Sequence, residues 1–277
     1  MRLPLPSFSS AKMVDDVVAE RQGGRNAKSF NAIAVQWKGK VQEYINHGGS
    51  PEFIKPWDIA SPAKKSFLNL YNSPAQGSAQ GVMLQALRKH NLVLCPACGE
   101  AGKPNTLDHY LPKGTYPHFS VTPANLFPMC DACQGEKLEK IGDAVNPRFF
   151  LHPYFDAFLD QTLFVLRIIQ PFNAPSFSFS ANASLEAAQQ NIVTAHMREL
   201  DMERRFTHFA LTQHIRMLRL ASGMRKSGQD IASQVEAFRD LYAHPTKNSW
   251  EYIYFDAVIK DADLIDHLRT GVLPNNI

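Results

Sequence analysis

The chain has 277 residues, of which 44% are hydrophobic, and its formal net charge is +3. This length allows one domain or two, and the hydrophobic share is high enough for a packed core. The small positive charge permits nucleic-acid binding without establishing it. No run is long and apolar enough to span a membrane, and residues 1–6 lack the apolar segment of a secretory signal, so we expect a cytoplasmic protein.

Residues 1–94 have the periodicity of helices joined by loops. Apolar residues recur at helical spacing over 11–22 and 31–46, and two shorter segments over 62–71 and 80–90 have the same character. The sequence therefore predicts an N-terminal helical region that leads directly into the first pair of cysteines.

Residues 95–157 differ from their surroundings, because short extended runs replace the helical pattern. We expect strands over 106–111 and 119–121, followed by a helix over 133–139. Residues 158–277 return to a mainly helical pattern after two strands at 163–170 and 176–180. Helices are expected over 184–242, with Ser184 as the N-cap, and over 248–268, with a disordered tail after Thr270. The expected fold is α+β, with a central core between two mainly helical regions.

All four cysteines of the chain lie in the central segment. They form two Cys-x-x-Cys pairs, Cys95 with Cys98 and Cys130 with Cys133. Each pair places two thiolates on one turn, which suits two corners of a tetrahedral zinc site. In a reducing cytosol, paired cysteines bind metal far more often than they form disulfides. The sequence therefore predicts a structural Zn²⁺ ion held by four thiolates.

Between the cysteine pairs, Asp108 and His109 combine two groups that phosphodiester hydrolysis needs. A carboxylate suits a hard cation such as Mg²⁺ or Mn²⁺, and an imidazole has a pKa near the working pH of a general base. Neighbouring side chains on a strand point to opposite faces, so both line one pocket only if the strand twists or ends there. Pro112 makes an irregular strand end plausible.

Two longer strings carry a family resemblance. The first runs from Leu107 to Lys113 (LDHYLPK), and the second from Pro123 to Lys137 (PANLFPMCDACQGEK). With the preceding cysteine pair, they resemble the zinc-stabilised branch of the HNH endonuclease family, whose pattern is Asp-His-x-x-Pro, Asn-Leu, and Cys-x-x-Cys followed by His or Asn and then Lys. The resemblance covers about residues 95–140, and it implies a ββα-metal core.

The resemblance also implies roles for single residues. Asp108 would bind the catalytic metal, His109 would be the general base, and Asn125 would orient His109 across the hairpin. The cysteines would hold structural zinc, and Lys137 would contact a phosphate or brace the fold. Gln134 stands where the family has His or Asn; its amide oxygen can still bind Mg²⁺. Alternatively, His118 or His152 would complete the metal shell.

The expected function is metal-dependent hydrolysis of DNA by an HNH endonuclease. The form of the motif resembles bacterial nucleases of anti-phage defence, which implies a partner ATPase. The alternative is a catalytically inactive zinc module that binds DNA or protein, and the Gln134 position favours it. The C-terminal helices also carry a group of basic residues: Arg198, Arg204, Arg205, Arg216, Arg219, Arg225 and Lys226. This group could contact the DNA backbone. We favour the alternative, a solvated helix face with ion pairs such as Asp201 with Arg205.

Overall fold

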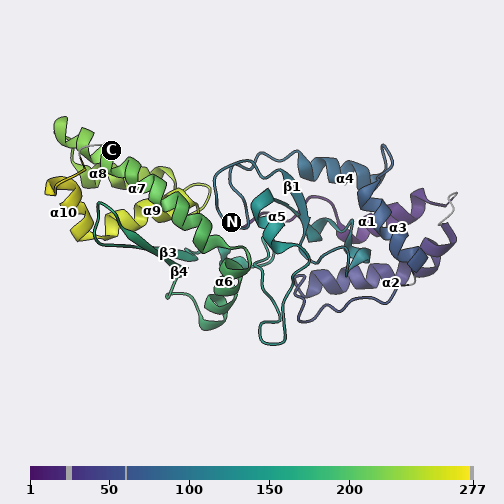
Figure 1. Cartoon of the computed structure of the whole chain (residues 1–277). Coiled ribbons are helices and arrows are strands. Elements are labelled where there is room, and N and C mark those ends of the chain that lie inside the picture. Colours follow the sequence, from purple (N-terminus) through teal and green to yellow (C-terminus); the bar gives the residue numbers. More distant parts are fainter. Residues whose placement is uncertain (23–26, 60, 275–277) are drawn as a thin grey trace. The chain divides into compact units, whose positions relative to one another are not determined.

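The computed structural model describes residues 1–22, 27–59 and 61–274. About half of the chain is helical, and two small antiparallel sheets of two strands each complete a mixed α+β fold, as predicted (Figure 1). The chain forms two compact units. One contains Arg2–Ala97 and Gly102–Ala157, and the other contains Met1, Cys98–Ala101 and Phe158–Ile277.

The first unit begins with the four helices that the apolar periodicity indicated. They are α1 (Ser10–Glu20), α2 (Ala27–Asn46), α3 (Ser61–Asn72) and α4 (Ala79–Arg88). Two begin at serine caps, which satisfy otherwise unpaired backbone N–H groups. The Ser9 hydroxyl accepts from the Lys12 amide, and the Ser78 hydroxyl accepts from the Gly81 amide, both at 3.3 Å.

A hairpin and a short helix follow in the same unit. Strands β1 (Thr106–His109) and β2 (Leu126–Met129) pair antiparallel, with Asp108 opposite Phe127 and His109 opposite Leu126. Helix α5 (Asp131–Lys137) begins directly after β2. The strand expected at 119–121 was wrong: prolines open two 3-10 turns, Pro117–Phe119 and Pro123–Asn125, and the partner strand comes after them.

The N-terminal helices hold the long connection between β1 and β2. The Trp37 indole donates to the His118 carbonyl at 2.8 Å, and the Ser120 hydroxyl donates to the Phe67 carbonyl at 2.8 Å. The rings of Trp37 and Phe67 pack edge to face at 4.8 Å, with Phe119 fully buried nearby in the same core. Segments 1–94 and 95–157 therefore share one hydrophobic core.

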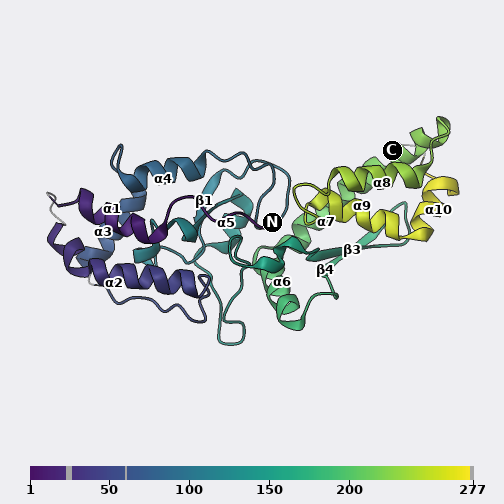
Figure 2. The same cartoon turned by 180° about the vertical axis from the view of Figure 1, so that it is seen from behind.

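The second unit combines a hairpin with five helices. Strand β3 (Phe164–Ile169) pairs with β4 (Ser176–Ala181), and α9 (Trp250–Lys260) packs on β3 while α7 (Met202–Lys226) packs on β4 (Figure 2). The remaining helices of this unit are α6 (Ala187–Glu199), α8 (Ile231–Leu241) and α10 (Ala262–Thr270).

Three local expectations for this unit were wrong. Helix α6 is capped by Glu186 in a capping box with Gln189, so Ser184 lies before the helix. The single helix expected over 248–268 is two helices, because Asp261 adopts an extended conformation and accepts from the Leu264 amide at 2.9 Å. Disorder was expected after Thr270, but the Val272 carbonyl accepts from Asn173 at 2.8 Å; residues 275–277 lie outside the described part of the chain.

A helix that crosses a bilayer is about 20 residues long and mostly apolar. Within residues 1–22, 27–59 and 61–274, no helix has the length and apolarity needed to cross one.

Candidate metal centre and catalytic site

The four cysteines come together as the sequence predicted. The sulfur atoms of Cys95, Cys98, Cys130 and Cys133 all lie within 4.8 Å of one another. Four thiolates around one zinc ion, with Zn–S bonds of ~2.3 Å, stand ~3.8 Å apart. The Cys130 amide donates to the Cys95 sulfur at 3.4 Å, a contact that favours the thiolate. The group could therefore hold a metal ion such as zinc.

The turn after Cys98 requires a glycine. Gly99 has a φ of +80°, and a Cβ at this position would lie 2.0 Å from the Asn248 carbonyl oxygen. The Trp250 indole donates to the Cys98 carbonyl at 2.7 Å, and the Trp250 amide donates to the Gly99 carbonyl at 3.3 Å. These contacts orient the backbone that carries the Cys98 sulfur.

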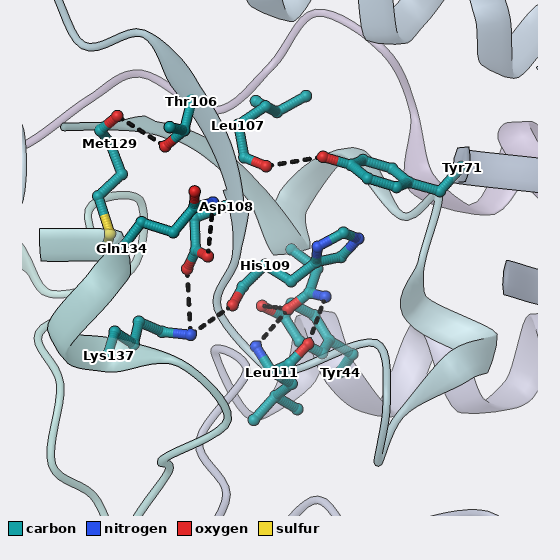
Figure 3. A network of polar contacts seen from close by, with 11 residues as sticks. Tyr44, Tyr71, Thr106, Leu107, Asp108, His109, Leu111, Met129, Gln134 and Lys137 are labelled. Carbon is teal, nitrogen blue, oxygen red and sulfur yellow. Dashed lines mark hydrogen bonds and ion pairs between the residues drawn. The ribbon is translucent and has the colours of Figure 1, made fainter. Parts of the chain in front are cut away.

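Asp108 lies between β1 and α5 (Figure 3), where its carboxylate contacts two α5 side chains. One carboxylate oxygen forms an ion pair with the Lys137 ammonium at 3.0 Å, and the other accepts a long hydrogen bond of 3.4 Å from the Gln134 amide. Lys137 is only 1% exposed, and its ammonium also donates to the His109 carbonyl at 2.7 Å. Lys137 therefore braces β1 against α5 and does not extend outward to a ligand.

The His109 ring lies on the opposite side of β1, against Tyr71 (Figure 3). Its Nε2 atom is 2.9 Å from the Ser120 carbonyl oxygen, so this nitrogen carries the proton and Nδ1 keeps the lone pair. Burial, together with the positive charges of Lys113, Lys137 and Arg88, lowers the pKa of His109 to about 3. The ring is therefore neutral at physiological pH, unlike the free imidazole assumed from the sequence.

Asn125 fastens the backbone around His109 rather than touching its ring. The Asn125 side-chain oxygen accepts from the Leu111 amide at 2.8 Å, and its side-chain nitrogen donates to the carbonyls of Leu111 at 3.0 Å and Phe119 at 3.3 Å. Phe119 precedes Ser120, the residue whose carbonyl holds the His109 ring. Asn125 thus holds two backbone segments that lie close to His109 and Ser120 in the sequence.

A buried chain of polar groups continues from Asn125 to His152. The Tyr44 hydroxyl is 3.0 Å from the Asn125 oxygen and 3.0 Å from His152 Nε2. The Tyr154 amide donates to His152 Nδ1 at 3.2 Å, which leaves the proton on Nε2. His152 therefore donates to Tyr44, and Tyr44 donates to Asn125. Burial lowers the pKa of His152 well below its usual value, which keeps this direction fixed.

Of the three candidates for completing the metal shell, Gln134 is the one whose side chain contacts Asp108. His152 is engaged with Tyr44, and the His118 ring packs at 5.4 Å from Trp57 and at 4.0 Å from Phe119. Neither histidine joins Asp108 in a metal-binding group of three or more within the described residues.

Four residues around this site were not singled out by sequence reasoning. Tyr44 and Tyr71 come from α2 and α3, and their spacing in the sequence gives no sign of a contact with the motif. Arg88 ends α4, and its guanidinium lies 5.6 Å from the Tyr71 ring; the Lys113 ammonium lies 4.6 Å from the same ring. Lys113 follows the Asp-His string directly, which was an available signal.

The basic residues of the C-terminal helices largely support the fold. Arg204 pairs with Asp201 at 2.5 Å, whereas Arg205, expected to be its partner, pairs with Glu100. The Arg225 guanidinium donates at 2.7 Å to three backbone carbonyls at the end of α10, those of His267, Leu268 and Gly271.

Replacing Tyr44 by Phe should destabilise the first unit by about 1–3 kcal/mol. The substitution leaves the His152 Nε2 proton without its buried partner, and an unsatisfied buried group costs about this much. The Asn125 oxygen loses one donor and keeps the Leu111 amide. Tyr116→Phe is the matched control, because the buried Tyr116 hydroxyl makes a longer bond of 3.3 Å to the Ile54 carbonyl. Urea unfolding measures both; equal losses would contradict the importance of the Tyr44 network.

The sequence is similar to that of a phage protein. The chain is similar to protein ea31 of Escherichia phage lambda, with 30% identity over 172 residues, which are 60% of this chain and 51% of ea31. The chain therefore spans about half the length of the curated relative it matches. No family model matches the chain, and no solved structure matches it.

Proposed function

We propose that the chain is an HNH-type endonuclease that hydrolyses DNA phosphodiester bonds with a divalent metal ion. The observation that carries this proposal is one bonded network in which a two-stranded hairpin and α5 gather Asp108, His109, Asn125, Gln134 and Lys137. These are the motif residues of the resemblance, and each is placed by contacts within that hairpin and helix.

The donor set near α5 suits a hard cation. Asp108 and Gln134 would hold Mg²⁺ or Mn²⁺, since a carboxylate and an amide oxygen are ligands these ions accept. The side-chain nitrogen of Gln134 faces Asp108, and a 180° rotation of the side-chain amide would place its oxygen there instead. When bound, such an ion neutralises charge on the phosphate and on the leaving oxygen.

In this proposal His109 supplies the proton transfer, and the phosphate reaches both Asp108 and His109 because β1 ends at His109, its last paired residue. The Nδ1 lone pair of His109 accepts a proton from the attacking water, and the Ser120 carbonyl stabilises the resulting imidazolium through Nε2. Asn125 keeps the Leu111 and Phe119 backbones in place during this step, so that the ring does not turn away. Lys137 fixes the Asp108 carboxylate and the His109 backbone together.

A plasmid-nicking assay with Mg²⁺, with Mn²⁺ and with neither tests this proposal. We expect supercoiled DNA to be nicked only when a divalent ion is added. The rival function is a zinc module that binds without cutting, and the Lys137 ammonium at 3.0 Å from Asp108 favours it, because this charge already neutralises the carboxylate. Binding without nicking under every metal condition would select the rival.

Changing Gln134 tests the metal shell directly. Gln134→Ala should raise the Mg²⁺ concentration for half-maximal nicking on the order of tenfold, because one oxygen ligand is lost. Gln134→His should strengthen the use of Mn²⁺ and extend activity to Co²⁺ or Ni²⁺, which bind imidazole better than Mg²⁺ does. Glu136→Gln, on the same helix, is the control. An unchanged Mg²⁺ requirement in Gln134→Ala would remove Gln134 from the site.

The cellular setting is part of the same proposal. We propose that the chain acts in the bacterial cytoplasm as the nuclease of an anti-phage system, alongside a partner ATPase, as the resemblance implies. Co-purification of an ATPase with the tagged full chain from its native host would support this setting.

A further inference from the structure

We propose that Arg88 and Lys113 form a binding site for a backbone phosphate of DNA on the His109 side of β1. This inference rests on the proposed function, because the site would hold the DNA backbone of the substrate at the proposed nuclease centre. The two cations come from distant segments, the end of α4 and the loop after β1, and they meet at one aromatic ring.

Both Arg88 and Lys113 lie over the ring of Tyr71. The Lys113 ammonium lies 4.6 Å and the Arg88 guanidinium 5.6 Å from its ring centroid, and Arg88 also contacts the Tyr71 hydroxyl. The hydroxyl donates to the Leu107 carbonyl of β1 at 2.7 Å, which fixes the ring on the strand. Cation–π contacts of this kind hold side chains without neutralising them.

The positive charge of this site is not balanced within the described part of the chain. Neither Arg88 nor Lys113 forms an ion pair with a carboxylate among the described residues, although Glu139 lies beside Gly114. Arg88 is exposed and Lys113 is half-buried, so an incoming anion can reach both. Two unpaired cations side by side repel each other, and a phosphate between them removes that repulsion.

The site also lies where a nuclease needs it. The Tyr71 ring packs at 4.4 Å from the His109 ring (Figure 3), so the cations stand one side chain away from the base. Lys137 cannot serve this purpose, because it is buried and committed to Asp108 and the His109 carbonyl. A phosphate held by Arg88 and Lys113 places the DNA backbone against the His109 side of the hairpin.

Salt-dependent DNA binding tests the assignment. A short fluorescein-labelled duplex is titrated by anisotropy at increasing salt, in buffer without added Mg²⁺ or Mn²⁺, which avoids chelators and keeps zinc in place. Each of Arg88→Gln and Lys113→Gln should lower the slope of log Kobs against log[salt] by about 1, and the double variant by about 2. Arg88→Lys and Lys113→Arg, which keep the charge, should keep the slope.

Lys65→Gln is the matched control, an exposed cation on α3 whose spacing of six residues from Tyr71 puts it on another face of the helix. Three results overturn the proposal: no duplex binding by the wild type, a wild-type slope in the double variant, or an equal loss in Lys65→Gln. Circular dichroism and zinc content exclude misfolding. Binding is measured without cleavage. If the variants reduce the slope but the protein never nicks DNA, the phosphate site is supported and the proposed nuclease function is contradicted.

Discussion

His109→Ala should slow DNA nicking by roughly 10²–10⁴-fold, the usual cost of losing a general base. The ring accepts the proton of water through Nδ1, while Nε2 is occupied by the Ser120 carbonyl. Zinc content should stay the same, because the group that could hold the ion consists of four cysteine sulfurs and does not include this ring. Gel quantification of nicked plasmid under saturating Mg²⁺ measures the effect.

The control for this substitution is His118→Phe. His118 lies in the same loop, and neither of its ring nitrogens has a hydrogen-bond partner among the described residues. Its replacement by a similar ring should leave nicking unchanged. If His109→Ala nicks DNA nearly as fast as the wild type, His109 is not the base.

The burial of His109 also determines the expected pH dependence of nicking. A free histidine, with a pKa near 6.5, would be half protonated and half inactive close to that pH. Desolvation holds the pKa of His109 at about 3, so the ring stays unprotonated throughout the range from pH 5 to pH 8. We therefore expect no loss of rate through His109 as the pH falls from 8 to 6.

Cys130→Ser should release the zinc and lower the melting temperature on the order of 10 °C. Structural zinc contributes folding free energy directly, and a domain of this size loses about 2–4 °C for each kcal/mol. The effect is large because zinc bonded to sulfurs that lie within 4.8 Å of one another joins segments distant in the sequence, and this cross-link is lost. Metal analysis and thermal unfolding measure the two outcomes.

Ala132→Ser provides the matched control, since it adds a hydroxyl to the same turn without removing a sulfur. It should keep full zinc content and the wild-type melting temperature. A freshly purified wild-type protein without zinc would overturn the assignment of the cluster.

Local patterns predicted the parts of the fold that depend on local physics. The helices α1 to α4 follow from apolar periodicity, and the cysteine cluster follows from two Cys-x-x-Cys turns. The second strand of the first hairpin was misplaced because Phe119 and Val121 are apolar for another reason. They fill the core beneath a 3-10 turn, and proline geometry decides that turn.

The contacts around the candidate site required the tertiary structure. The sequence offered Gln134, His118 and His152 as partners of Asp108, and only the packing of α5 against β1 distinguishes them. Tyr71 is separated from Leu107 by more than thirty residues, so its bond to β1 leaves no local pattern. The direction of the His152–Tyr44–Asn125 chain likewise depends on one backbone amide, that of Tyr154.

The attachment of the β1–β2 connection to α2 and α3 limits how this motif can be used elsewhere. Trp37 and Phe67 bond to the backbone or side chain of residues 118 and 120, and they cover the apolar side of that loop. A peptide that begins at residue 95 would contain every residue of the motif, but the apolar side of the β1–β2 connection would be exposed to water. Transplanting the motif into another scaffold therefore means transplanting its two supporting helices with it.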